Sequence, residues 1–270
     1  MTLSRKARWL LRGAMAVGLA FIYVPLAIVL INSFNADRTF AWPPPRWTTH
    51  WWVRAWDNAG AREALWTSVQ AGLGATAIAL LLGALVAFAV QRHRFFGRDA
   101  VSLLVVLPIA LPGIVTGIAL DTAFRSVIAP LGIGKGLFSV IVGHATFCVV
   151  VVYNNVLARL RRMGGNLEEA SADLGADGVQ TFRYVTFPVL RSALLAGGLL
   201  AFGLSFDEII VTTFTAGPGV QTLPIWIFNN LFRPNQAPVI NVVAAALIVL
   251  SVIPIYLAQR ISDTATGGRL

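Results

Sequence analysis

Five stretches of this sequence continue for more than 20 residues without a single Asp, Glu, Lys or Arg. They are residues 13–36, 64–91, 100–120, 136–158 and 234–259. Each is long enough for an α-helix to cross a bilayer, which takes ~20 apolar residues. A sixth apolar run begins at residue 192, is interrupted by Asp207 and Glu208, and then resumes as far as Phe214. Backbone groups in lipid must be satisfied within the segment, so runs this long and continuous predict helices and not a closed barrel.

These runs predict an all-α polytopic membrane protein with six transmembrane helices. We expect helices at roughly 12–33, 65–90, 100–121, 137–158, 191–214 and 237–259. Composition agrees, because 57% of the residues are hydrophobic and only 12% are charged, far from the balance of a soluble domain. The expected organisation is a first helix with an outer Trp/Pro-rich loop (1–62), a core transmembrane domain (63–262) containing an inner loop at 159–190, and a tail (263–270).

The distribution of Lys and Arg predicts that both termini are cytoplasmic. In that orientation fourteen of the 21 basic residues lie inside and seven outside, as the positive-inside rule requires. The net charge of +9 is then a consequence of membrane topology and not a nucleic-acid-binding surface. The first helix lacks a small-residue cleavage site after its apolar run of ~20 residues, so we expect it to stay uncleaved.

The first outer loop, from Phe34 to Arg62, is rich in proline and tryptophan. Pro43, Pro44 and Pro45 favour an extended backbone. The tryptophans favour an amphipathic segment at the membrane interface, and the alternative is a stacking site for a cationic ligand. They are Trp42, Trp47, Trp51, Trp52 and Trp56.

No catalytic, nucleotide or metal site is expected in this chain. The sequence GIGKG around Lys135 lacks the Ser or Thr that follows the Lys of a phosphate-binding loop. Ser205 lies in a G-x-S-x pattern, but every histidine precedes it, the reverse of the order in rhomboid-type proteases. We interpret His144 as a buried polar group bonded to a neighbouring helix, and Cys148 as a small buried hydrophobic residue. No metal-ligand spacing such as C-x-x-C is present.

The third expected helix contains Pro108, Pro112, Gly113 and Gly117. Proline removes a backbone donor and kinks a helix, while neighbouring groups satisfy the freed carbonyls. The kink either allows a helix that lines a pathway to bend during transport or serves static packing, and the sequence leaves both open.

Asp207 and Glu208 are the only acids within an apolar run. Ionisable groups at membrane depth face the bundle interior or a water-filled cavity. Counting ~1.5 Å per residue from Arg191, Asp207 lies ~24 Å along its helix, nearer the outer side. We predict that at least one of the two acids lines a translocation path, where it would bind a cationic solute; the alternative is a structural bridge. Further polar lining, or hydrogen bonds between helices, would come from Thr212, Thr213, Tyr153, Asn154 and Asn155.

The inner loop carries a Gly-punctuated polar segment, residues 167–188, which we call the elbow. Its first part, LEEASADL, predicts a short amphipathic helix with Glu168 and Glu169 in the first turn, where the helix dipole favours negative charge. Gly175 suits the left-handed position that ends a helix. A second apolar stripe leads to Pro188 and the fifth transmembrane helix. The pattern predicts two short helices that meet at a glycine and present a defined surface to another protein.

The elbow resembles the EAA signature of permease subunits of binding-protein-dependent ABC importers. Glu169, Ala170, Gly175 and Pro188 match it, and the residues standing where the commonest pattern has Ala, Ile and Leu are Ser171, Val185 and Phe187. The likeness extends over about 21–261 and is to the spermidine/putrescine branch, in particular to the second inner-membrane permease of a four-gene polyamine-type transporter operon. Segments that carry it include FIYVPLAIVLINSFN, GHATFCVVVVYNNVLARL and LSFDEIIVTTFTAGPGVQTLP.

The resemblance implies a type I ABC importer permease in the bacterial inner membrane that moves a small cationic solute, such as putrescine or spermidine, into the cytoplasm. It implies a different second permease, two copies of a cytoplasmic ATPase, a periplasmic solute-binding protein and membrane lipid as partners, with no nucleic acid. This chain would bind no cofactor and be no enzyme, because ATP and Mg belong to the ATPase. The elbow would be the coupling helix, contacting the ATPase through Glu168, Glu169, Ala170, Ser171, Asp173, Leu174, Gly175, Ala176 and Pro188.

Two other functions stay open at this point. The same machinery could import an amino-acid-like amine or another small solute. An ATP-independent secondary carrier is the alternative from another class, although it would need coupling acids deep in several helices, and here only one helix has them.

Overall fold

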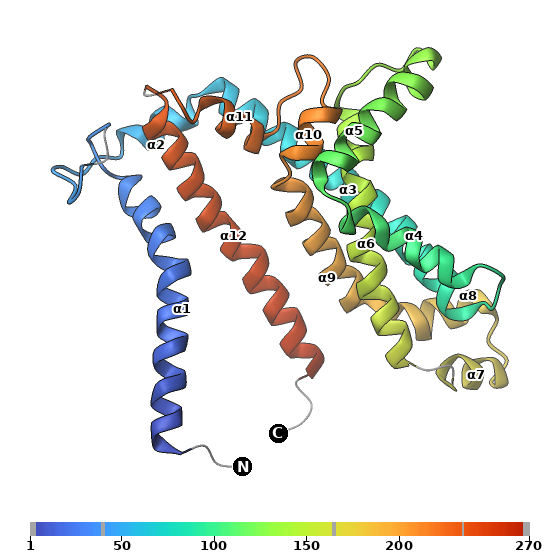
Figure 1. The fold of residues 1–270 in the computed structure, drawn as a ribbon. Coiled ribbons are helices and arrows are strands. Elements are labelled where there is room, and N and C mark those ends of the chain that lie inside the picture. Colours follow the sequence, from blue (N-terminus) through green and yellow to red (C-terminus); the bar gives the residue numbers. More distant parts are fainter. Residues whose placement is uncertain (1–3, 39–40, 164–165, 234, 267–270) are drawn as a thin grey trace. The chain divides into compact units, whose positions relative to one another are not determined.

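The protein is built from helices, whose order can be followed in Figure 1. The computed structural model describes the backbone of residues 4–38, 41–163, 166–233 and 235–266, and the side chains of these ranges as far as residue 252. Within them the one β-type pairing is an isolated bridge between Asn35 and Trp47. The predicted all-α class is confirmed. Part of the predicted tail, 267–270, lies outside the described residues.

Five helical stretches of the described chain are long and apolar enough to cross a membrane. They are Arg5–Asn32, Ala59–Arg92, Gly113–Leu131, Leu137–Met163 and Gly178–Phe206, and Ala237–Val252 is a shorter apolar segment. The multi-pass character that the apolar runs predicted is therefore confirmed. The count of six spans and the cytoplasmic position of both termini stay predictions.

The chain forms two compact units, whose boundaries fall within α3, α11 and α12. Unit 1 comprises Met1–Arg62 and Ile227–Ile253, and unit 2 comprises Glu63–Trp226 and Pro254–Leu270. In unit 1, helix α1 (Arg5–Asn32) has no buried residue, and Asn241 at the start of α12 (Ala237–Thr266) donates a hydrogen bond to the carbonyl of Val29 at 2.9 Å. In the Trp-rich loop, α2 (His50–Trp56) buries Trp51 beneath the guanidinium of Arg38.

The remaining helices lie in unit 2, except for the first residues of α3 and the last residues of α11, which belong to unit 1. In chain order they are α3 (Ala59–Arg92), α4 (Arg98–Ala110), α5 (Gly113–Ala123), the π-helical η1 (Phe124–Ile128), the 3₁₀ turn η2 (Ala129–Leu131), α6 (Leu137–Met163), α7 (Asn166–Asp173), α8 (Gly178–Thr181), the π-helical η3 (Phe182–Thr186), α9 (Phe187–Phe206), α10 (Ile210–Thr215) and α11 (Leu223–Asn230).

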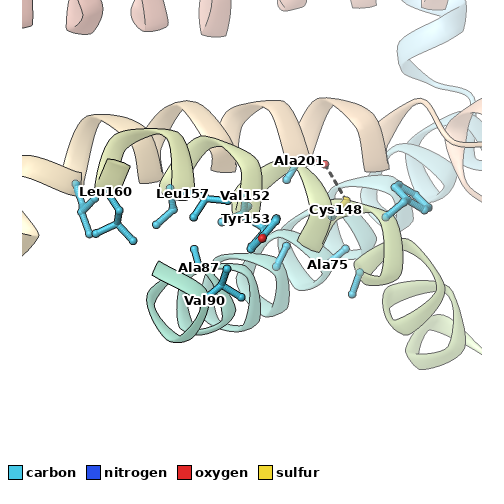
Figure 2. Packing of buried hydrophobic residues seen from close by; sticks show 14 of the residues in the cluster. Ala75, Ala87, Val90, Cys148, Val152, Tyr153, Leu157, Leu160 and Ala201 are labelled. Atoms are coloured by element: carbon cyan, nitrogen blue, oxygen red, sulfur yellow. Dashed lines mark hydrogen bonds between the residues drawn. The ribbon is translucent and has the colours of Figure 1, made fainter. Parts of the chain in front are cut away.

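Small residues of α3 and α9 let these helices pack closely on α6, the most buried helix of the unit. Every fourth residue of α3 is small and buried at Ala71, Ala75 and Ala79, and the pattern continues to Ala87. Figure 2 shows Ala75 and Ala87 of α3 in the same apolar cluster as Val152 and Tyr153 of α6. Because lipid provides no hydrophobic drive between helices, close backbone packing of this kind is what associates them.

Two of the predicted helices are interrupted, which corrects the sequence-based boundaries. The helix expected at 100–121 is divided at residues 111–112, since Leu111 is extended (φ −81°, ψ 145°) in front of Pro112, as a residue before proline prefers. The helix expected at 191–214 is likewise divided at 207–209, between α9 and α10. We call these the first and second breaks.

Candidate functional site

The elbow is a turn between two helices, and capping groups stabilise both sides of it. Helix α7 ends at Asp173 and is followed by Gly175, whose φ of +85° lies in the left-handed region, where a side chain would be strained. The next helix starts with a capping box, in which Asp177 accepts from the amide of Gln180 at 2.8 Å and the Gln180 side chain accepts from the amide of Asp177 at 3.0 Å. The predicted short helix and its glycine stop are both confirmed.

The second half of the elbow differs from the prediction of a separate short helix. Helix α8 runs through η3 into α9, and the three form one helical stretch, Gly178–Phe206. Pro188 does not interrupt it, and the wide π-helical turn η3 ends just before the proline. The elbow therefore leads directly into the fifth transmembrane segment.

One acid of the elbow anchors it to the transmembrane helices. Oε1 of Glu168 lies 2.9 Å from Nη2 of Arg92, the last residue of α3, and accepts a hydrogen bond from the buried hydroxyl of Thr186 at 2.7 Å. The hydroxyls of Ser171 and Thr181 are 3.1 Å apart and join the two arms of the elbow. Arg92, Glu168, Thr181 and Thr186 line a pocket of about 340 Å³ whose walls also include Phe88 and Ala176.

The other face of the elbow is free in this chain. Leu174 is 90% exposed and Val179 76% exposed. Five other predicted contact residues are also exposed, and they are Glu169, Ala170, Asp173, Gly175 and Pro188. Large apolar side chains protrude here beside acidic residues, on a segment that Glu168 anchors to the transmembrane helices. Such a surface suits the docking of another protein.

At the second break, Glu208 has a structural role as well as a charge. Its Oε1 accepts a hydrogen bond from the amide of Val211 at 2.8 Å and so caps the start of α10. Glu208 also lines a small cavity together with residues of the first break. Asp207, by contrast, is exposed on the surface of this chain.

His144 holds the two sides of the second break together. Its Nδ1 lies 2.7 Å from the hydroxyl of Ser205 in α9, and its Nε2 lies 2.8 Å from the hydroxyl of Thr212 in α10. Thr212 donates its one hydroxyl hydrogen to the carbonyl of Glu208, so it accepts from Nε2–H, and Ser205 donates to Nδ1. The prediction of a buried histidine bonded to a neighbouring helix is confirmed.

The pair His144 and Ser205 has the spacing of a base and a nucleophile, but the surroundings give it a packing role. His144 is fully buried and Ser205 is 2% exposed, so no substrate can approach the serine oxygen. The second ring nitrogen contacts a threonine and not the carboxylate that orients a catalytic histidine.

Most of the other residues predicted to line the path make hydrogen bonds within the chain. Tyr153 is buried and donates to Ser102 of α4 at 3.1 Å, and Thr212 belongs to the His144 network. Asn155 donates to the carbonyl of Val151 in its own helix, and Thr213 donates to the carbonyl of Ile209 just before α10. Asn154 is exposed on α6. Cys148 is buried, as predicted, and contacts the carbonyl of Ala201 (Figure 2).

Sequence reasoning missed two groups of residues. Arg92 was used only as one of the basic residues that predict the topology. It and the acid Glu168 are expected on the same side of the membrane, which could have indicated that they pair. Asp121 was also missed: it accepts from Arg125 at 2.8 Å and from Lys135 at 2.5 Å, and Lys135 also donates to the carbonyl of Phe214. These bonds tie α5 to the end of α10.

Comparison with known proteins agrees with this architecture. Residues 75–267 match the family model of the binding-protein-dependent transport system inner membrane component. The spermidine/putrescine transport system permease protein PotC of Haemophilus influenzae is 34% identical over 258 residues, which cover 95% of this chain and 98% of PotC. The putrescine transport system permease protein PotI of Escherichia coli K12 is 30% identical over 86% of this chain and 83% of PotI.

A solved structure shares the fold at much lower identity. It is the crystal structure of a bacterial alginate ABC transporter in complex with an alginate pentasaccharide-bound periplasmic protein, with a TM-score of 0.71 and 16% identity over 97% of this chain and 96% of that chain. The family model, residues 75–267, includes the elbow and both breaks. The chain therefore belongs to the family of inner-membrane permease components of binding-protein-dependent ABC transporters.

Proposed function

We propose that this permease imports a small polyamine, such as putrescine or spermidine, and that it is driven through the elbow by a separate ATPase. The chain is a multi-pass inner-membrane protein of a binding-protein-dependent importer. Relatives that carry the names of spermidine/putrescine and putrescine permeases support the substrate class. The observation that carries the coupling role is the elbow itself, exposed at Leu174 and fixed from behind by Glu168.

Coupling would proceed through two connections. The first is the ion pair from Glu168 to Arg92, which joins the elbow to the end of α3. The second is the helical stretch Gly178–Phe206, which at 29 residues is about 43 Å long. It joins the elbow to the second break. A displacement of the elbow by the ATPase would therefore move α3 and the region of Glu208 together.

The partners we propose are a second, different permease, two copies of a cytoplasmic ATPase and a periplasmic solute-binding protein. The family description supports a binding protein. The exposed apolar surface of this chain and its exposed polar groups Asp207 and Asn154 suit a second permease that completes the pathway. ATP and Mg would be bound by the ATPase, and this chain would have no enzymatic role.

The translocation path would run beside the second break. Glu208 is the stronger of the two predicted acids for this role, because it lines a cavity, and Asp207 and Asn154 would face the pathway between the two permeases. Thr212 and Tyr153 would support the path by holding helices together, because both are buried with partners inside the chain.

The test is uptake by the complete transporter in proteoliposomes that contain ATP. We expect radiolabelled putrescine or spermidine to accumulate only when the ATPase, ATP and the binding protein are all present. Uptake that follows an ion gradient and persists without the ATPase would instead identify a secondary carrier. ATP-driven uptake of an amino-acid-like amine, with no uptake of either polyamine, would support the ABC importer mechanism and refute the proposed polyamine substrate.

A further inference from the structure

We propose that the first turns of α1 form a binding surface for the headgroups of anionic phospholipids. The surface consists of Arg5, Arg8, Trp9 and Arg12, which we call the arginine stripe. This inference concerns the contact between the chain and its membrane, and it does not depend on the polyamine substrate.

The spacing of these residues places them on one side of α1 (blue in Figure 1). Arg8 and Arg12 follow Arg5 by three and seven residues, and at 3.6 residues per turn the three lie within an arc of about 60°. Trp9 lies about 40° beyond Arg5 on the same side, and the guanidinium of Arg12 is 5.9 Å from the centre of its ring. The first turns of α1 therefore present three positive charges and an aromatic ring in one direction.

The length of α1 places the stripe in the headgroup layer. Residues 13–32 of the helix carry no charge, and a helix of this length extends for about 30 Å, which matches the hydrocarbon core of a bilayer. The preceding residues, 5–12, extend the helix by about 12 Å more. Basic side chains beside the core keep their charged ends at the interface, and tryptophan is enriched at the same level.

No acid neutralises the stripe within the described part of the chain. Helix α1 contains no Asp or Glu, and the first acid of the sequence is Asp37, beyond the other end of the helix. The basic partners in the ion pairs of the described residues are Arg92, Arg125 and Lys135. The stripe residues are exposed and α1 buries no residue, so the three charges are available to groups outside the chain.

An anionic phospholipid fits the stripe better than other negatively charged partners. Its phosphate lies at the depth of the arginines, and a guanidinium can hold a phosphate through two parallel N–H donors. An acidic protein surface would also attract the arginines, but the ring of Trp9, 69% exposed, is typical of a lipid interface. Ser4 already caps the helix by accepting from the amide of Ala7 at 3.2 Å, so the binding groups are the arginine side chains.

Removal of single charges at similar depth tests the stripe. The complete transporter is purified and titrated in detergent with phosphatidylglycerol or with the zwitterionic phosphatidylcholine, and bound lipid is counted by native mass spectrometry. The site variants are Arg5→Gln and Arg8→Gln. The matched control is Lys6→Gln, because Lys6 lies between them in depth but about 130° around the helix from the centre of the arginines. All three side chains are exposed, so assembly should be unchanged.

We expect the unmodified transporter to prefer phosphatidylglycerol over phosphatidylcholine. Each site variant should need about fivefold more phosphatidylglycerol for half occupancy, because one basic residue near an anionic surface contributes ~1 kcal/mol. Lys6→Gln should change this concentration by less than about twofold. If one site variant does not assemble, the other decides alone.

Three results would overturn the proposal. Equal losses in the site variants and the control, or no preference for phosphatidylglycerol, would show that the stripe is not a binding surface. Displacement of the lipid by millimolar inorganic phosphate would identify a site for free phosphate. Loss of the ATPase from the purified Arg8→Gln complex, with lipid binding unchanged, would show that the stripe binds a protein and not the membrane.

Discussion

At the scale of single residues, His144 is a buried polar side chain that joins the helices on the two sides of the second break. One nitrogen contacts the last turn of α9 and the other contacts α10, so the ring spans the gap that residues 207–209 leave in the backbone. Thr212 in turn donates a hydrogen bond to the carbonyl of Glu208. The position of the Glu208 carboxylate thus depends on a residue that never reaches the cavity.

Replacing His144 by Leu should destabilise the permease by about 1–3 kcal/mol, because two buried hydroxyls lose a partner. The measurement is thermal unfolding of the purified complex in detergent. Ser205→Ala made in the His144→Leu background should have little further effect, since the hydrogen bond is already absent. Strictly additive effects of the two substitutions would contradict the network.

Gly175 and Glu169 allow a second test at this scale. A side chain at a φ of +85° is strained by roughly 1–2 kcal/mol, so Gly175→Val should distort the elbow. Glu169→Ala should remove a charge from its exposed face. We expect either change to lower uptake per ATP hydrolysed while the complex still co-purifies with its ATPase. Transport equal to that of the unmodified protein would remove the elbow from the coupling mechanism.

At the scale of elements, the elbow and the breaks differ in how far they follow from local sequence. Helix α7, its acidic first turn and its glycine stop are encoded within ten residues, and all three were predicted. The second break was not predicted, because the apolar pattern continues past it and the hydrogen bonds that stabilise it come from α6, some 60 residues earlier in the chain. Pro112 signalled a kink at the first break but not a complete interruption.

The link between α3 and the elbow gives a prediction at this scale. Arg92 and Glu168 are each about three-quarters buried, so Arg92→Ala leaves Glu168 with only the Thr186 hydroxyl and should reduce uptake per ATP by about fivefold or more. The exchange Arg92→Glu with Glu168→Arg should restore part of the loss, and Arg94→Ala, an exposed neighbour, should have no effect. Failure of the exchange to rescue, together with normal coupling in Arg92→Ala, would show that the pair does not transmit motion.

At the scale of the whole molecule, the sequence predicted class and family well and site geometry less well. Apolar runs are long enough to predict membrane helices without knowledge of their packing. The pairing of Arg92 with Glu168, of Lys135 with Asp121, and the cavity that the two breaks share at Glu208 each join segments that are distant in the chain. Such contacts depend on how the helices pack, and no local pattern encodes them.

The orientation of the chain is a prediction for the whole molecule, and its single cysteine makes the test simple. Cys148 is fully buried and should not react with a membrane-impermeant maleimide. In intact cells, Asp57→Cys should be labelled from outside, and Arg94→Cys should be labelled only after the membrane is permeabilised. The opposite pattern would reverse the topology and place the elbow outside the cell.

The close approach of α3 to α6 has a consequence for where this protein can move. A Cβ on Gly83 would lie 2.9 Å from the carbonyl oxygen of Val149 and 3.0 Å from the amide nitrogen of Tyr153, so α3 and α6 approach each other closely here and a larger residue would not fit. We expect motion instead at three interruptions of the helices in unit 2, the glycine at 175 and the two breaks. The two breaks both border the small cavity at Glu208, so bending at either break would change the shape of that cavity.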